Sequence, residues 1–273
     1  MSRAVSVRDT RPPAADAPAR KRSSGGSDLP ASSYFRRSEL PLTSLAFLLP
    51  LMVLYELGTR AFTFDPVHQT EQRIIAFNLM QRFFLLFGAT GRYMPAVAVS
   101  IVLICWHVAR RDKWKVRPAH VAGMGLESVV LAIPLLIAAR VAERYLSHVS
   151  LSAAGMSAAK LAGAKSLFVL SLGAGVYEEL IFRLVAFTVL SFVLIDLLEM
   201  RKGLGSLLVV VISSALFAGY HYLGDEPFRW WTFAFRTLAG LYFGIVFLCR
   251  GFGITAGSHA AYDLCVVALR ALA

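Results

Sequence analysis

Residues 166–199 read SLFVLSLGAGVYEELIFRLVAFTVLSFVLIDLLE. This run is apolar over more than the roughly 20 residues that an α-helix needs to cross a bilayer. Its middle carries Glu178, Glu179 and Arg183 within the seven letters YEELIFR. A charge at the centre of a membrane helix costs about 2.5 kcal/mol or more, and such residues are usually paired or functional. The stretch therefore predicts a membrane span with a polar centre inside it.

The composition of the whole chain also indicates a membrane protein. Of its 273 residues, 57% are hydrophobic and 16% are charged, whereas soluble domains average about 45–50% and 25%. The apolar residues come in blocks of roughly 17–22, the length of a membrane span. We predict an all-α, polytopic transmembrane bundle of about seven or eight spans with an intramembrane polar cavity, in preference to a soluble all-α protein.

Further spans are expected at 43–62, 93–109, 121–139, 206–223, 229–248 and 252–272. The run 166–199 is either one long kinked helix or two shorter ones. The segment 74–89 carries Asn78, Gln81 and Arg82 among aromatic residues. It is short for a span, so we interpret it as an amphipathic helix along the membrane interface.

The net charge of +11 is concentrated beside the apolar blocks. Lys and Arg gather in the N-terminal tail, in RRDKWKVR at 110–117 and in RKG at 201–203. Basic loops of this kind are typical of the cytoplasmic side of a membrane protein and do not indicate nucleic-acid binding. We expect a multi-pass protein of the plasma (inner) membrane with a cytoplasmic N-terminus.

The chain divides into three parts by composition. Residues 1–40 are rich in Ser, Pro, Ala and Arg and predict a disordered basic tail. Residues 41–119 hold the N-terminal transmembrane helices and the interfacial helix, and residues 120–273 hold the polar clusters. The cysteines Cys105, Cys249 and Cys265 lie in apolar segments without CxxC spacing. They predict neither a disulfide framework nor a thiolate zinc site.

Within YEELIFR, Glu179 and Arg183 are four residues apart and share a helical face, so they can form an ion pair. Glu178 is rotated about 100° away and stays outside that pair. Burial without a partner favours the protonated form of a carboxylate, which can then exchange protons near neutral pH.

Two more clusters have the same spacing. Phe217 and His221 lie in LFAGYHYL at 216–223, and His259 and Asp263 lie in GSHAAYD at 257–263. An imidazole exchanges protons close to neutral pH, and Asp263 can orient His259 or act directly. Each cluster alone is a weak signal. Three clusters on three apolar helices predict that the bundle brings them together around one cavity.

Other polar residues in apolar segments lack such a pattern. Glu56 and Glu127 stand alone, and we interpret them as interfacial or bracing residues. Arg236 is a candidate carboxylate partner near the site. Gly240 and Gly244 form a small-xxx-small face suited to close helix packing.

In order along the chain, the three clusters resemble the motifs of the CPBP family of intramembrane proteases. This is the CAAX-processing and bacteriocin-processing group, also called Abi, and it is related to the eukaryotic Rce-type CAAX endopeptidases. The resemblance covers about residues 120–273. The family pattern EExxxR, FxxxH and HxxxN or HxxxD is matched by Glu178, Glu179 and Arg183, by Phe217 and His221, and by His259 and Asp263.

The resemblance implies hydrolysis of a peptide bond near the membrane-anchored end of a protein or peptide substrate. It implies that Glu178 is the general base, that His221 assists it, and that His259 and Asp263 stabilise the oxyanion or position the water. Glu179 and Arg183 would brace the motif helix, with Phe217 in support. The best-studied eukaryotic relatives have Asn at the place of Asp263. Asn can donate to an oxyanion and an ionised Asp cannot, so Asp263 must be protonated there or serve His259.

Glu178, His221 and His259 could in principle hold zinc, but the HExxH spacing is absent. We favour a metal-free glutamate mechanism without a cofactor. The expected partners are a membrane-tethered substrate and the lipid bilayer, and the oligomeric state is not indicated. One alternative is a non-catalytic immunity or scaffold protein on the same fold. A proton-coupled transporter is less favoured, because such folds usually repeat their polar helices in both halves.

Overall fold

The computed structural model describes residues 33–65, 70–145, 163–224 and 226–272. These residues are helical except for loops and one short antiparallel pair, β1 (Phe64–Asp65) with β2 (Thr70–Glu71). The predicted all-α class is therefore confirmed, and the strand pair is a small addition that the sequence did not predict. The helices before the polar motifs are α2 (Pro41–Phe62), α3 (Ile75–Leu86), α4 (Met94–Arg110) and α5 (Pro118–Tyr145).

Among the described residues, five helical segments are long and apolar enough to cross a membrane: Pro41–Phe62, Pro118–Arg144, Ala164–Leu197, Lys202–Leu223 and Trp230–Ala271. The apolar helices α3 and α4 are shorter. Large apolar side chains such as Leu57, Leu126 and Phe192 are exposed on the outside of the bundle, where a soluble protein would carry polar ones. The protein is an integral membrane protein. The crossing number of seven or eight and the interfacial position of α3 stay predictions.

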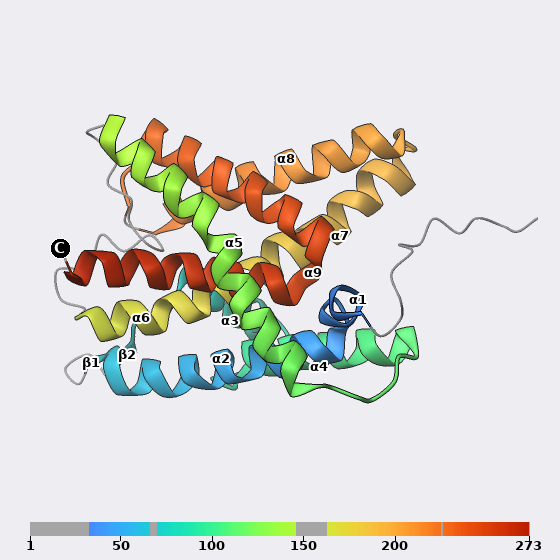
Figure 1. Cartoon of the computed structure of the whole chain (residues 1–273), viewed down its shortest axis with the longest axis horizontal. Helices are drawn as coiled ribbons and strands as arrows, with labels where there is room; N and C mark the ends of the chain where they lie inside the picture. Colours follow the sequence, from blue (N-terminus) through green and yellow to red (C-terminus); the bar gives the residue numbers. More distant parts are fainter. Residues whose placement is uncertain (1–32, 66–69, 146–162, 225, 273) are drawn as a thin grey trace, which may run out of the picture.

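The run 164–197 is one continuous helical segment. The predicted block 166–199 is therefore one long helix and not two shorter ones. It passes through α6 (Ala164–Gly173), α7 (Ala186–Ser191) and three π-helical stretches, and in Figure 1 it leads from α6 through the middle of the molecule to α7. The π-helical stretches are η2 (Ala174–Glu178), η3 (Leu180–Val185) and η4 (Phe192–Leu197). Short π-helical segments within α-helices are frequent at functional sites, and no sequence pattern had indicated them.

Helix α9 (Trp230–Leu272) bends at Gly251, whose backbone angles are φ 73° and ψ −178°. Glycine adopts a positive φ without the steric penalty of other residues. Figure 1 shows the result as a V, with an orange-red first arm (230–250) and a dark red second arm (252–272). The two predicted spans at 229–248 and 252–272 are therefore two helical arms that meet at a kink at Gly251.

Helix α9 is the centre of the bundle, since it packs on α2, α5, α6, η2 and on α8 (Lys202–Tyr220). Some of these contacts depend on small residues. A Cβ on Gly175 would lie 2.5 Å from the Ala256 carbonyl oxygen and 2.6 Å from the Ala260 Cβ. A Cβ on Gly240 would lie 2.9 Å from the Ser214 Cα. Gly240 thus packs against α8 as predicted, and backbones approach closely beside the polar motifs.

The predicted disordered tail was too long by several residues. Residues 1–32 lie outside the described part, but α1 (Tyr34–Ser38) is helical, and Ser33 caps it by accepting from the Arg36 backbone N–H at 3.5 Å. Polar contacts hold α1 in place, so this segment carries no apolar periodicity by which it could be predicted.

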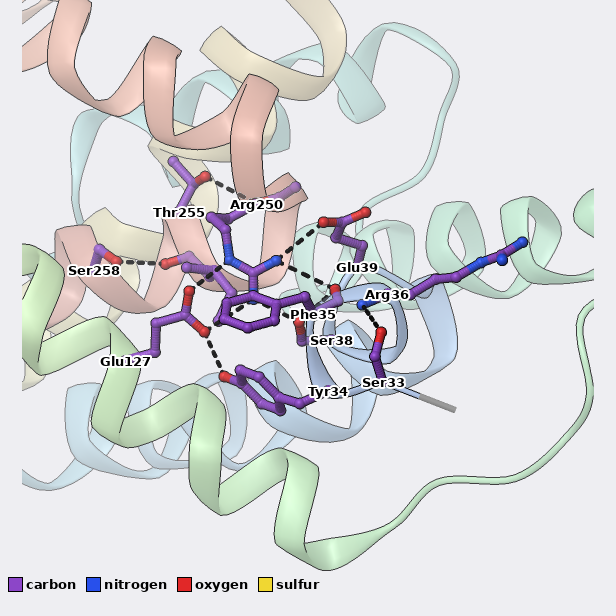
Figure 2. A network of polar contacts seen from close by, with 12 residues as sticks. Ser33, Tyr34, Phe35, Arg36, Ser38, Glu39, Glu127, Arg250, Thr255 and Ser258 are labelled. Atoms are coloured by element: carbon purple, nitrogen blue, oxygen red, sulfur yellow. Dashed lines mark hydrogen bonds and ion pairs between the residues drawn. The ribbon is translucent and has the colours of Figure 1, made fainter. Parts of the chain in front are cut away.

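Arg250, at the bend of α9, makes those polar contacts (Figure 2). Its guanidinium donates to Ser38 Oγ at 2.8 Å, to Glu39 Oε1 at 3.0 Å and to Glu127 on α5 at 2.5 and 3.0 Å. The Tyr34 hydroxyl donates to the same Glu127 carboxylate at 2.5 Å. Helix α1, α5 and the α9 bend are therefore joined at one point, and Glu127 is a bracing residue as predicted.

Candidate active site

The two adjacent acids of YEELIFR both point into the bundle. Glu178 ends η2 and Glu179 directly precedes η3, and their exposed fractions are 2% and 0%. A π-helical turn holds more residues than an α-helical turn, so neighbouring side chains are less widely separated around the axis. Both carboxylates therefore face the interior, which a regular α-helix would not favour.

Glu179 and Arg183 form the predicted ion pair, with Arg183 Nε 3.1 Å from Glu179 Oε2 and both side chains fully buried. Arg183 also donates from Nη2 to the Gly240 carbonyl oxygen at 3.0 Å. Its guanidinium carbon lies 4.7 Å from the centre of the Phe217 ring. Arg183 thereby links the motif helix to α9 and α8, as expected of a brace.

Glu178 has a partner that sequence reasoning missed. Its Oε1 accepts a hydrogen bond from the hydroxyl of Tyr220, which is buried at the end of α8. The one signal in the sequence was that Tyr220 directly precedes His221 in an apolar segment. The i,i+4 spacing used to find the motifs relates residues on one helix, so it could not reveal this contact between two helices. Glu178 Oε2 has no hydrogen-bond partner among the described residues.

The second oxygen of Glu178 lies close to both imidazoles. Its Oε2 is 3.9 Å from His221 Nε2 and 3.8 Å from His259 Nε2. These separations exceed a direct hydrogen bond, but they are short enough for one bridging water to reach. The structure thus brings together three residues that are predicted from three separate motifs.

His221 is oriented by a backbone carbonyl group one turn earlier in the chain. It begins the short 3₁₀ turn η5 (His221–Leu223), and its Nδ1 lies 2.8 Å from the Phe217 carbonyl oxygen. A carbonyl only accepts, so Nδ1 carries the proton and Nε2 of the neutral ring has a free lone pair. The Phe217 ring also packs edge-on against His221 and His259, with centroids 5.1 and 5.7 Å apart.

His259, on the second arm of α9, is oriented by Glu179. Its Nδ1 lies 2.7 Å from Glu179 Oε1, and its ring stacks on Phe243 at 4.7 Å. Orienting this imidazole is one of the two roles that the sequence leaves open for Asp263. Asp263 Oδ2 is 3.7 Å from His259 Nε2, on the opposite side of the ring, and has no hydrogen-bond partner among the described residues. Glu179 therefore does more than brace, because it makes the close contact with His259, and the role of Asp263 stays a prediction.

A small cavity of about 40 Å³ opens onto these groups, enough for a water or two. Aromatic rings and Ala239 form much of its wall. Its polar lining comes from His221, His259, Asp263, Thr232 and Arg236. Glu178 is not among the lining residues, but its Oε2 lies within 3.9 Å of both imidazoles. Arg236 faces the cavity as predicted, and its guanidinium binds the Glu226 carboxylate through two hydrogen bonds of 3.0 and 2.9 Å.

A larger apolar groove of about 830 Å³ lies elsewhere, between α2, α6 and the second arm of α9. It shares no lining residue with the polar cavity. Apart from Lys165 and Cys265, its lining is apolar. We therefore assign the chemistry to the smaller cavity.

Within the described ranges, no group of three His, Cys, Asp or Glu side chains is arranged to hold a metal ion. Among the three residues considered for zinc, Glu178 Oε2 lies 3.9 Å from His221 Nε2 and 3.8 Å from His259 Nε2. The metal-free mechanism stays a prediction.

Glu56, the other isolated acid, also has a bracing contact. It accepts from Arg73 Nη2 at 2.9 Å, and the same nitrogen lies 2.9 Å from Glu71. Arg92 completes this cluster by donating to Glu71 at 2.6 and 2.7 Å. Glu56 is therefore a bracing residue, and its partner Arg73 lies 17 positions away in the sequence.

With the geometry of the site established, the chain was compared with known proteins. Residues 161–265 match the family model described as type II CAAX prenyl endopeptidase Rce1-like. This segment is Rce1-like. All three motifs of the Rce1-like segment lie inside the match, which confirms the resemblance that they predict. No curated protein and no solved structure matches the chain.

Proposed function

We propose that this protein is an intramembrane endopeptidase that hydrolyses a peptide bond near the membrane-anchored end of a protein or peptide substrate. The observation that carries the proposal is the position of Glu178 Oε2, 3.9 and 3.8 Å from the Nε2 atoms of His221 and His259. A carboxylate and two imidazoles around a single water position supply the acid–base groups that amide hydrolysis needs. The Rce1-like segment supports a membrane protease.

In the proposed reaction, a water lies between Glu178 Oε2 and the two imidazoles. Glu178 takes one proton from this water, and the remaining hydroxide adds to the carbonyl carbon of the substrate. The hydroxyl group of Tyr220, which donates to Oε1, holds the carboxylate in the orientation that this step requires.

The two imidazoles have different roles. His221 has its Nδ1 proton held by the Phe217 carbonyl oxygen, so its Nε2 can accept a proton from Glu178 and deliver it to the leaving amine. The C–N bond then breaks. His259 has its Nδ1 held by Glu179, so when its Nε2 is protonated it can donate to the oxyanion. Asp263, 3.7 Å from that Nε2, can assist in positioning water.

The mechanism uses no metal, and metal removal tests this. Purified protein should keep its activity in a zinc chelator. Loss of activity on chelation, with recovery on addition of zinc, would instead make Glu178, His221 and His259 ligands of the ion.

The substrate and the proposed activity can be sought together in membranes. The termini of membrane proteins would be compared between cells that carry the wild-type protein and cells that carry Glu178→Gln. We expect a small set of proteins to retain an uncut terminus only with the variant. Identical termini in both membranes would favour a non-catalytic scaffold or immunity protein on the same fold. A plasma-membrane location with a cytoplasmic N-terminus is part of the proposal and rests on the basic loop at 110–117.

A further inference from the structure

The catalytic cavity contains a cation that the hydrolytic mechanism does not use. Arg236 lies on the first arm of α9, its side chain is 8% exposed, and it lines the cavity with His221 and His259. Among the described residues, it is the only Arg or Lys in the lining. Arg183, the other buried guanidinium nearby, is engaged by Glu179 and by a carbonyl oxygen.

Arg236 already holds a carboxylate in the structure. Nη1 and Nη2 each donate to a different oxygen of Glu226, at 3.0 and 2.9 Å. This is the fork geometry by which arginine recognises carboxylates, and it is specific in direction as well as charge. The Tyr222 ring, 5.6 Å from the guanidinium carbon, adds a second contact to the cation.

We propose that Arg236 binds the free C-terminal carboxylate of the substrate, and that Glu226 occupies this position when no substrate is bound. The proposal rests on the peptidase function above and makes it more specific. It names the residue that would recognise the end of the substrate, because Arg236 lines the same cavity as His221 and His259.

Exchange of the two carboxylates is electrostatically reasonable. The site already contains Glu178, Glu179 and Asp263, so an additional buried negative charge would be costly. When the substrate carboxylate replaces that of Glu226, the number of charges around Arg236 does not change. Glu226 lies between η5 and α9, and residues 223–224 and 227–230 on either side of it are exposed. The released Glu226 side chain can therefore reach water.

The test compares two peptides that differ only at the C-terminus. The probes are an N-acetylated, farnesylated CaaX tetrapeptide with a free carboxylate and the same peptide with a C-terminal amide. Their dissociation constants are measured on the full chain in detergent, with Glu178→Gln present so that bound peptide is not cut. We expect the acid to bind at least about tenfold more tightly than the amide.

Three further variants identify the cause. Arg236→Met should reduce the acid-to-amide affinity ratio to about one, and Arg236→Lys should give an intermediate ratio because it keeps the charge but loses the fork. Glu226→Gln should raise the ratio several-fold, because the competing carboxylate is gone. Arg229→Gln is the matched control, since it removes an exposed arginine three positions after Glu226 and should leave the ratio unchanged.

Equal affinities for the two peptides, including no measurable binding of either, would overturn the proposal. A ratio that survives Arg236→Met would do so too. If Arg236→Met does not fold, a Glu226→Gln variant with an unchanged ratio would still contradict it. Because only binding is measured, the outcome is independent of whether Glu178 acts as the base.

Discussion

The two oxygens of the Glu178 carboxylate have different neighbours, and the proposed reaction depends on that difference. Oε1 is held by Tyr220, while Oε2 is left facing His221 and His259. A carboxylate that is held at one oxygen only keeps the other available for water. Tyr220 is therefore a positioning residue in this account.

Tyr220→Phe removes the hydroxyl and keeps most of the ring. We expect kcat to fall about tenfold with little change in KM, because a neutral hydrogen bond to a charged group contributes about 1.5–3 kcal/mol at most. Steady-state hydrolysis by the purified variant measures this. Tyr222→Phe is the control, since its half-exposed hydroxyl donates only to the Arg229 carbonyl oxygen, at 3.3 Å. An unchanged kcat in Tyr220→Phe would contradict the positioning role.

A second single-residue prediction concerns stability at low pH. Partial burial alone would raise the pKa of Glu71, but hydrogen bonds from Arg92 and Arg73 outweigh it and hold the pKa below the ordinary value of 4.5. A lowered pKa in the folded state stabilises the fold above that ordinary value, and the stabilisation is lost as the pH falls through the folded-state pKa.

Thermal unfolding in detergent at pH 7 and near pH 4 would measure this effect. The melting temperature of the wild type should fall more between the two pH values than that of Glu71→Gln, which has no carboxyl group to titrate. Equal decreases in the two proteins would show that Glu71 does not contribute.

Single residues also show how far the sequence could predict the site. The i,i+4 rule predicted the Glu179–Arg183 pair correctly, since both residues lie on one helix. The same rule offered Asp263 as one possible partner for His259, but it could not show that Glu179, 80 positions away, makes the closer contact. Contacts between helices depend on how the helices pack, and residue spacing carries no information about that.

At the level of elements, the close approach of η2 to α9 is what allows the motifs to meet. Gly175 lies about one turn before Glu178, and it packs against Ala256 and Ala260, which lie on either side of His259 in the sequence. Gly175→Ala should lower the free energy of unfolding by about 1–3 kcal/mol, because overpacking forces the helices apart. The same displacement should reduce activity.

Denaturant titration in detergent and a peptidase assay would measure the two effects. Gly203→Ala is the matched control, because a Cβ there meets no atom within 4 Å. It should leave stability unchanged or raise it by about 0.4–1 kcal/mol. If both variants had the same stability, the helices would not be in close contact at Gly175.

The helices themselves were largely predictable. Hydrophobic blocks predicted these helices to within a few residues, for example 43–62 for Pro41–Phe62 and 93–109 for Met94–Arg110. The π-helical stretches and α1 were not predicted. A π-helical turn has no hydrophobic period of its own in an apolar segment, and α1 is positioned by distant polar partners such as Arg250.

At the level of the whole molecule, Arg250 joins the start of the described chain to the middle and to the bend of α9 (Figure 2). We predict a coupling energy of about 1–3 kcal/mol between Arg250 and Glu127, since their side chains are only 13% and 18% exposed. A double-mutant cycle with Arg250→Met and Glu127→Gln measures it through the free energy of unfolding.

The control cycle uses Arg140 and Glu143, an ion pair whose side chains are 58% and 33% exposed. Its coupling energy should be below about 1 kcal/mol, as is usual for surface pairs. A coupling energy no larger for Arg250 and Glu127 than for the control pair would mean that the bend is held by apolar packing alone.

The convergence of three motifs from distant parts of the chain was predictable, because buried charges in a membrane must meet partners. A bracing role was among the interpretations of Glu56 and Glu127 from the sequence, but their partners Arg73 and Arg250 were not predicted. Those partners are brought close by the pairing of β1 with β2 and by the bend at Gly251.

The most direct test of the account is the rate at which the purified Glu178→Gln variant hydrolyses a quenched fluorescent, farnesylated CaaX peptide. Gln keeps the shape of the side chain and its contact with Tyr220 but cannot take a proton from water. We predict a rate about 10²- to 10⁴-fold below that of the wild type, with an unchanged melting temperature. Glu143→Gln, which alters a partly exposed acid on α5, should keep the full rate. A Glu178→Gln variant as active as the wild type would contradict the assignment of Glu178 as the catalytic base.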